Sequence, residues 1–222
     1  MNYRHQWSDD TAVKWPRGKV VCVGRNYLAH AHELGNEVPG EPLLFMKPAS
    51  ALASLDGPVL IPRDRGETHH EAEITILIGN PLTAATPGQV RAGIAGIGLG
   101  LDLTLRDLQT RLKENGHPWE RAKAFDGSCP LTRFVPLGDF DSLENIEFRF
   151  SVNGELRQQG SSALMLFGII TLIVEISASF TLEPGDVVLT GTPAGVAPLN
   201  EGDRFELELV GHLSVESSVE SS

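Results

Sequence analysis

Residues 67–79, ETHHEAEITILIG, place two histidines and two glutamates directly before an apolar run that ends at a glycine. The run predicts a strand, and alternate side chains of a strand share one face. One face is entirely apolar and is expected to contact the core: Ala72, Ile74, Ile76 and Ile78. The other face carries Glu71 and Glu73, about 6–7 Å apart along the strand. Two carboxylates at this spacing repel each other unless a cation lies between them.

A third acid occurs in a similar setting. Asp102 lies within GLGLDLTL, residues 98–105, an apolar, glycine-bounded strand in which an unpaired carboxylate would be costly to bury. Three carboxylates suit a hard cation, and we expect Mg²⁺ before Mn²⁺ or Ca²⁺. Three protein oxygens would leave about three positions of an octahedral ion open for substrate. The alternative is a solvated Glu-x-Glu face, and the residues alone do not bring Asp102 to the glutamates. Both readings stay open on this evidence.

The remaining pattern predicts an α+β fold with mixed sheets, because no regular βαβ repeat appears. A hairpin is expected around Asn153-Gly154, a dipeptide typical of a tight turn. A helix is expected to begin near Arg106. Further strands are expected over residues 19–24, 42–47, 59–62, 186–191 and 204–211. A short helix is expected over residues 25–35, and residues 86–96 have a helical start with Pro87 in the first turn.

The run 163–180, ALMLFGIITLIVEISASF, predicts the longest helix of the chain. It contains Glu175 and is marginal in length for a membrane span, so we expect a helix buried in the protein. The C-terminal residues 214–222, SVESSVESS, are polar and are expected to form an edge strand or a frayed end.

The composition is that of a globular protein, with 41% apolar and 21% charged residues in a chain of 222. A net charge of −11 argues against nucleic acid or an anionic membrane as a partner, because both would repel it. Cys22 and Cys129 have no metal or redox spacing, which is typical of a reducing compartment. The polar start, MNYRHQWSDD, has no apolar signal segment, so we expect a cytoplasmic protein.

Five motifs, taken in order, resemble the fumarylacetoacetate hydrolase family, and most closely its small single-domain members of the acylpyruvate hydrolase or oxaloacetate decarboxylase type. They are FMKPASAL (45–52), HHEAE (69–73), GLGLDLTLRDLQ (98–109), KAFDGSCPL (123–131) and LEPGDVVLTGTPAGVAPLNEGD (182–203). The resemblance implies a rolled, nearly barrel-like mixed β-sheet with short flanking helices, assembled as a homodimer. We interpret residues 1–222 as one catalytic domain: an N-terminal extension (1–16), the family-like region (17–210) and a polar tail (211–222).

The resemblance also implies site residues. The metal ligands match Glu71, Glu73 and Asp102, and the metal would be Mg²⁺ or Mn²⁺. His30 and Glu33 match an acid–base dyad on a lid that closes over substrate; their spacing puts both on one helix face, where a carboxylate can orient an imidazole. A plain surface pair is the alternative for these two residues.

Other residues are implied to surround the substrate, a small 2-oxo acid. Lys123 would lie beside the metal and offset surplus negative charge. The remaining candidates for substrate binding are Arg25, Asn26, Arg106, Gln109 and Thr192, of which Arg25 and Asn26 are the weaker ones. Lys47 and Ser50 either line the site or hold a turn before Pro48.

On this resemblance the leading hypothesis is hydrolysis of a C–C bond in a 2,4-dioxo acid, which converts an acylpyruvate into pyruvate and a carboxylic acid through an enolate. His30, oriented by Glu33, would activate the water, and Lys123 would stabilise the developing anion. Decarboxylation of oxaloacetate and keto–enol tautomerisation or 2-hydroxydienoate isomerisation would use the same site. Two other classes stay open, namely a metal-dependent binding protein without turnover and a globular protein with an acidic surface cluster.

Overall fold

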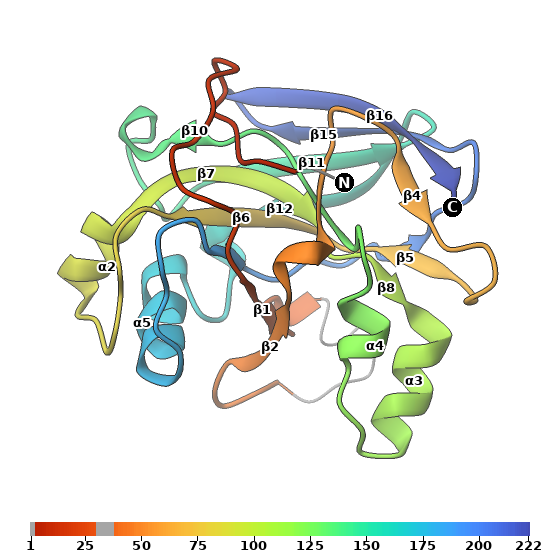
Figure 1. The fold of residues 1–222 in the computed structure, drawn as a ribbon, viewed down its shortest axis with the longest axis horizontal. Helices are drawn as coiled ribbons and strands as arrows, with labels where there is room; N and C mark the ends of the chain where they lie inside the picture. The colour runs from red at the N-terminus through yellow and green to blue at the C-terminus, as the bar shows by residue number, and fades with distance from the viewer. Residues whose placement is uncertain (1–2, 30–37) are drawn as a thin grey trace.

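A curled mixed β-sheet forms a half-barrel, and a few short helices flank it (Figure 1). This computed structural model describes residues 3–29 and 38–222. The α+β class with mixed sheets is therefore confirmed. In the described part of the chain, no helix is both long and apolar enough to cross a membrane.

The largest sheet runs in the order β2-β1-β13-β6-β7-β9-β3, with β10 paired to β7. Most neighbours are antiparallel, whereas β1 pairs with β13 and β3 with β9 in parallel. In chain order its strands are β1 (Val20–Gly24), β2 (Leu43–Lys47), β3 (Leu52–Ser54), β6 (Ala72–Ile78), β7 (Ile94–Leu101), β9 (Cys129–Leu131), β10 (Val135–Pro136) and β13 (Val187–Leu189).

A second sheet runs in the order β12-β11-β15-β16-β4. Its strands are β4 (Val59–Ile61), β11 (Glu147–Val152), β12 (Glu155–Ser161), β15 (Arg204–Leu209) and β16 (Leu213–Ser221). The predicted hairpin is confirmed, since Asn153 and Gly154 join β11 to β12 with φ values of 52° and 80°. The C-terminal residues form a strand rather than a frayed end. This strand, β16, pairs first with β15 and then, over Val219–Ser221, with β4.

A small third sheet, β14-β5-β8, decides where the acids lie. It consists of β5 (Thr68–His70), β8 (Thr104–Leu105) and β14 (Ala197–Pro198). His69 pairs with Thr104 in this sheet, and Ala72 pairs with Leu101 in the large sheet. Two residues of each segment lie between these pairings, His70 and Glu71 on one and Asp102 and Leu103 on the other. The Asp102 amide donates to the Glu71 carbonyl oxygen at 2.8 Å. The register of the two strands therefore brings the acids together.

The helices are short and lie on one side of the sheets, with α3 and α4 beside each other (Figure 1). They are α2 (Pro87–Gly93), α3 (Arg106–Glu114), α4 (Glu120–Lys123) and α5 (Ile169–Ser179), with 3₁₀ turns η1 (Ala49–Ala51), η2 (Leu137–Asp139) and η3 (Ser162–Leu164). The predicted starts of α2 and α3 are confirmed. At α2, Pro87 takes the first turn, and Thr86 and Gln89 form a capping box. The helix expected over 25–35 lies largely outside the described residues.

The expected helix over 163–180 is correct only from Ile169 onward. Before that point the backbone is engaged elsewhere: the Leu166 amide donates to the Asn26 carbonyl, the Phe167 amide donates to Asn26 Oδ1, and Met165 bridges to Tyr27. These bonds hold the segment extended, and α5 begins after Gly168. Hydrophobic periodicity could not reveal them, because their partner is far away in the sequence.

Both faces of β6 are buried. Its predicted core face packs into the main hydrophobic cluster, which also contains residues of β7, β11, β15 and α5. Leu77, on the opposite face, packs into a second cluster with Tyr3, Val13 and Val20. The N-terminal segment before β1 therefore covers the second face of the large sheet. Glu73 shares that face with Leu77, further along the strand, where a cavity replaces apolar packing.

Candidate metal centre

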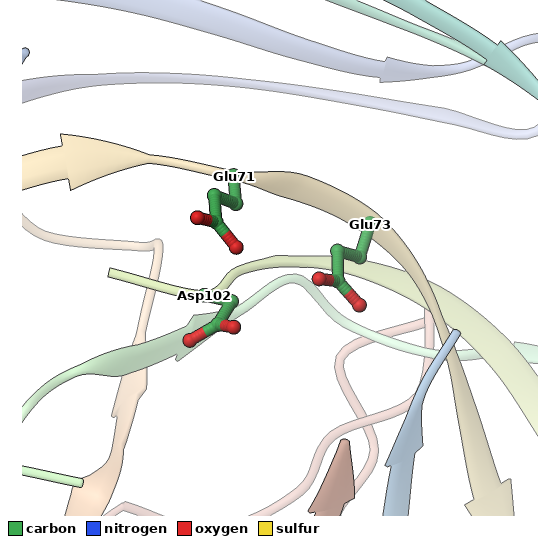
Figure 2. A group of neighbouring side chains, drawn as sticks. All are labelled: Glu71, Glu73 and Asp102. Carbon is green, nitrogen blue, oxygen red and sulfur yellow. The ribbon is translucent and has the colours of Figure 1, made fainter. Parts of the chain in front are cut away.

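Glu71, Glu73 and Asp102 meet at the junction of β5, β6 and β7 (Figure 2). Each offers a carboxylate oxygen, and these oxygens all lie within 4.8 Å of one another. The three residues are only 6%, 1% and 1% exposed. A solvated Glu-x-Glu face is therefore the wrong description of this stretch. The strand geometry turns both glutamates inward, and the β6–β7 register supplies the aspartate.

Cationic side chains and one peptide amide approach the acidic triad (Glu71, Glu73 and Asp102). Arg106 Nη2 donates to Glu71 Oε1 at 2.6 Å. Lys123 Nζ lies between two of the acids, 2.8 Å from Glu71 Oε2 and 2.6 Å from Asp102 Oδ2. The Gly191 amide donates to Glu73 Oε2 at 2.6 Å. Gly191 has a φ of 94°, a left-handed conformation that favours glycine, so this loop can turn its amide toward the carboxylate.

A second lysine, Lys47, is fully buried at the end of β2. Its Nζ lies 2.8 Å from Asp102 Oδ1. It also donates to the Lys123 carbonyl and, at 3.0 Å and 3.1 Å, to the carbonyl and hydroxyl of Ser128. Lys47 thus ties Asp102 to the loop after α4. Asp102 Oδ1 has this ion pair but no hydrogen bond from a described residue.

The charges of the triad shift the pKa values around it. Burial raises the pKa of Glu73 well above its usual range, and the charges of Asp102 and Glu71 raise it further. Burial alone would lower the pKa of Lys123, but Asp102 and Glu71 outweigh burial and raise it. Lys123 is therefore a permanent ammonium at this site, and it offsets part of the triad's charge.

The triad fits a hard divalent cation. It offers only oxygen ligands, the ligand atoms are already gathered, and Asp102 Oδ1 is a buried oxygen without a hydrogen bond. No thiol takes part: burial raises the pKa values of Cys22 and Cys129, which disfavours their thiolates.

One cavity brings together most of the residues predicted for the site. Its lining includes the triad together with Arg25, Arg106, Gln109, Lys123 and Thr192. Within it, Arg106 Nη1 donates to Gln109 Oε1 at 2.7 Å, so the first turn of α3 presents the two side chains as a unit. The predicted dyad His30 and Glu33 lies outside the described residues, and its role stays a prediction.

The structure does not bring Asn26 to this cavity. Its Nδ2 donates to the carbonyls of Thr190 and Phe167 at 2.8 Å and 3.0 Å, and its Oδ1 accepts from the Phe167 amide. The amide group is buried, and both of its N–H donors and its oxygen are engaged by the backbone. Asn26 therefore ties the segment before α5 to the end of β13. Its side chain does not line the cavity.

Thr192 is held by a buried network from the hairpin strand β12. Its hydroxyl donates to the Ala72 carbonyl at 2.8 Å and accepts from Gln158 Nε2 at 2.7 Å. Gln158 Oε1 in turn accepts from the Ala72 amide at 3.0 Å and from His70 Nδ1 at 2.9 Å. A substrate contact from Thr192 would therefore use its peptide amide, or its hydroxyl would first have to rotate.

Two supporting residues were missed or left open by the sequence: Gln158 was not a candidate, and Lys47 was expected either to line the site or to hold a turn before Pro48. Gln158 gave no signal, because it belongs to a hairpin whose pattern explains it as an ordinary strand residue. Lys47 gave a weak one, a lysine that ends an apolar strand before a proline. His70 has a supporting role: burial lowers its pKa to about 4, so the ring is neutral and positions Gln158.

Residues 19–220 match the family model described as fumarylacetoacetate (FAA) hydrolase C-terminal. The curated oxaloacetate tautomerase YcgM of Escherichia coli (strain K12) is 51% identical over 213 residues, which cover 96% of this chain and 97% of that protein. The mitochondrial oxaloacetate decarboxylase of Dictyostelium discoideum is 41% identical over 199 residues, which cover 89% of this chain and 91% of that protein.

Solved structures show the same fold. Fumarylpyruvate hydrolase from Pseudomonas aeruginosa, in complex with Mn²⁺ and pyruvate, aligns with a TM-score of 0.91 at 32% identity. The alignment covers 99% of this chain and 96% of that one. The rolled mixed sheet that the sequence motifs implied is thereby confirmed.

Replacing Lys47 tests the electrostatics of the buried site. Lys47→Met keeps the apolar stem but leaves Asp102 with one fewer cation, so we expect the metal-free protein to lose about 3–5 kcal/mol of unfolding free energy. The measurement is urea unfolding in the presence of a chelator. Arg149→Met is the control: Arg149 is paired with Glu208 at the surface, and its loss should cost less than about 1 kcal/mol. A similarly small loss for both variants would contradict the account.

Proposed function

Because the chain belongs to the fumarylacetoacetate hydrolase family and is an enzyme of that family, we propose that it interconverts the enol and keto forms of oxaloacetate with a divalent cation. One observation carries the choice of reaction. The E. coli relative, which is 51% identical over almost the whole chain, is named an oxaloacetate tautomerase. The buried acidic triad with Lys123 supports this chemistry, because it suits a cation and an oxyanion.

In this proposal Glu71, Glu73 and Asp102 hold Mg²⁺ or Mn²⁺. The ion supplies a Lewis acid that stabilises negative charge on the 2-oxo oxygen of the substrate. Lys123 contributes a positive charge within the same cavity, where its burial limits screening by water. Arg106 and Gln109 line the cavity together and provide donors for the adjacent carboxylate of the substrate.

Tautomerisation requires one proton to leave and one to arrive. When the enol becomes the keto acid, the hydroxyl on C2 loses its proton, the C2–O bond becomes a carbonyl, and the electron pair of the C2–C3 double bond takes up a proton at C3. We assign this proton transfer to His30, with Glu33 orienting its ring, on the basis of their sequence spacing. No water needs to attack, which distinguishes this reaction from hydrolysis.

Hydrolysis of a 2,4-dioxo acid is the second candidate. It is favoured by the P. aeruginosa neighbour, a fumarylpyruvate hydrolase whose structure contains Mn²⁺ and pyruvate. The two reactions share the enolate, and both would use the same acidic triad. They differ in whether a C–C bond breaks. Assembly as a homodimer and a cytoplasmic location stay predictions from the sequence.

A reaction panel tests the proposed function. With Mg²⁺ or Mn²⁺, the protein should speed the decay of enol-oxaloacetate, followed by the loss of enol absorbance, without matching release of CO₂. A chelator should abolish this activity, and added metal should restore it. Cleavage of an acylpyruvate that is faster than enol decay would favour the second candidate. Enol decay that survives complete metal removal would reject the role of the triad.

A substitution at His30 tests the proton transfer. His30→Ala should lower kcat for enol-oxaloacetate by about 100- to 10,000-fold, the usual contribution of a positioned acid–base group. His117→Ala removes an exposed histidine after α3 and serves as the control, with kcat expected to stay unchanged. Wild-type turnover in the His30 variant would assign the proton transfer to another residue.

A further inference from the structure

The site cavity has two chemically different ends. The deep end contains the buried acidic triad. Arg25 and Lys113 also line the cavity, and both are half-buried rather than enclosed. Lys113 was not among the predicted site residues. It follows Arg106 and Gln109 by seven and four residues on α3, so the three side chains lie along one face of the helix.

Lys113 is held against an aromatic wall of the cavity. Its Nζ lies 5.1 Å from the centre of the Trp119 ring, within the range of a cation–π contact, and Trp119 lines the same cavity. This contact fixes the ammonium at the cavity rather than leaving it free in solvent. The position is therefore suited to contact a bound molecule.

Arg25 and Lys113 have no carboxylate partner among the described residues. Arg106 and Lys123 are paired with the triad, whereas no described carboxylate lies within ion-pair distance of Arg25 or Lys113. Burial, together with the charges of Arg106 and Arg25, lowers the pKa of Lys113 to about 8. The charged form of an amine that is partly desolvated beside two guanidinium groups is destabilised, and a nearby anion would relieve this. Four cations line the cavity against three carboxylates, and a divalent ion would increase this excess by two.

The backbone at Arg25 gives independent support. Its φ is 60°, a left-handed conformation that costs free energy for a residue with a Cβ. Arg25 comes directly after Gly24, the last residue of β1, and this turn places its side chain at the cavity. Strained backbone of this kind is concentrated at ligand-binding positions.

We propose that Lys113, with Arg25, binds the second carboxylate of the substrate and makes the site selective for 2-oxo dicarboxylates over 2-oxo monocarboxylates. The inference rests on the proposed function for the identity of the reacting end. The competing role for Lys113 is structural: a lysine in the last turn of α3 also stabilises the helix C-terminus. A structural role would not distinguish one ligand from another.

The test uses two unreactive ligands that differ in one group. L-malate and (S)-2-hydroxybutyrate share the 2-hydroxy acid end, and a carboxylate in the first replaces a methyl group in the second. Calorimetric titration of the Mn²⁺-loaded protein should show that Lys113→Met weakens malate binding roughly tenfold or more, the loss expected for one charge-assisted hydrogen bond. Binding of 2-hydroxybutyrate should change less than about twofold, since it makes no such bond. Lys113→Arg should retain the preference for malate.

Lys14→Met is the matched control, because Lys14 is also a lysine over a tryptophan, 5.0 Å from the centre of the Trp15 ring, but does not line the cavity. It should leave both affinities unchanged. Thermal unfolding checks that each variant is folded, and Lys113→Gln replaces the methionine variant if that one is not.

Equal weakening of both ligands, unchanged malate binding, or no malate binding by the wild-type protein would each overturn the inference. The binding assay involves no turnover, so it is independent of the reaction panel. If malate selectivity depends on Lys113 but enol decay is not accelerated, only the proposed function fails. If enol decay is accelerated without this selectivity, only the role of Lys113 fails.

Discussion

The burial of three carboxylates within 4.8 Å of one another is the constraint on which the rest of the site depends. Such a cluster is unfavourable unless cations compensate it, because burial and mutual repulsion both oppose ionisation. Lys123, Lys47 and Arg106 provide that compensation from three different segments of the chain. The position of α4, the end of β2 and the start of α3 are thus linked to one electrostatic requirement, and a divalent ion would complete it.

The sheets are arranged so that this cluster can form. The β6–β7 pairing and the β5–β8 pairing leave Glu71 and Asp102 opposite each other, and the glycine-rich loop after β13 turns an amide toward Glu73. The hairpin strand β12 fixes the same loop through Gln158. The acidic end of the cavity is therefore built on strands, whereas α3 supplies Arg106, Gln109 and Lys113 to its lining.

The sequence predicted those features that a local period or turn determines. The alternation in residues 72–78 identified the core face of β6, and Asn153-Gly154 identified the hairpin. It could not predict features that depend on distant partners. Asn26 resembled a residue of the site but ties Phe167 in place, α5 begins later than its apolar run, and Lys47 reaches Asp102 across the fold. The resemblance to the family predicted that Asp102 lies with the glutamates. Lys113 could be identified only from the cavity that it lines.

The most direct test of the account is the anomalous scattering of crystals grown with Mn²⁺. The account predicts one strong anomalous peak that is coordinated by carboxylate oxygens of Glu71, Glu73 and Asp102 together. No peak at the triad in the presence of excess Mn²⁺, with the Lys123 ammonium still bound between Glu71 and Asp102, would contradict it.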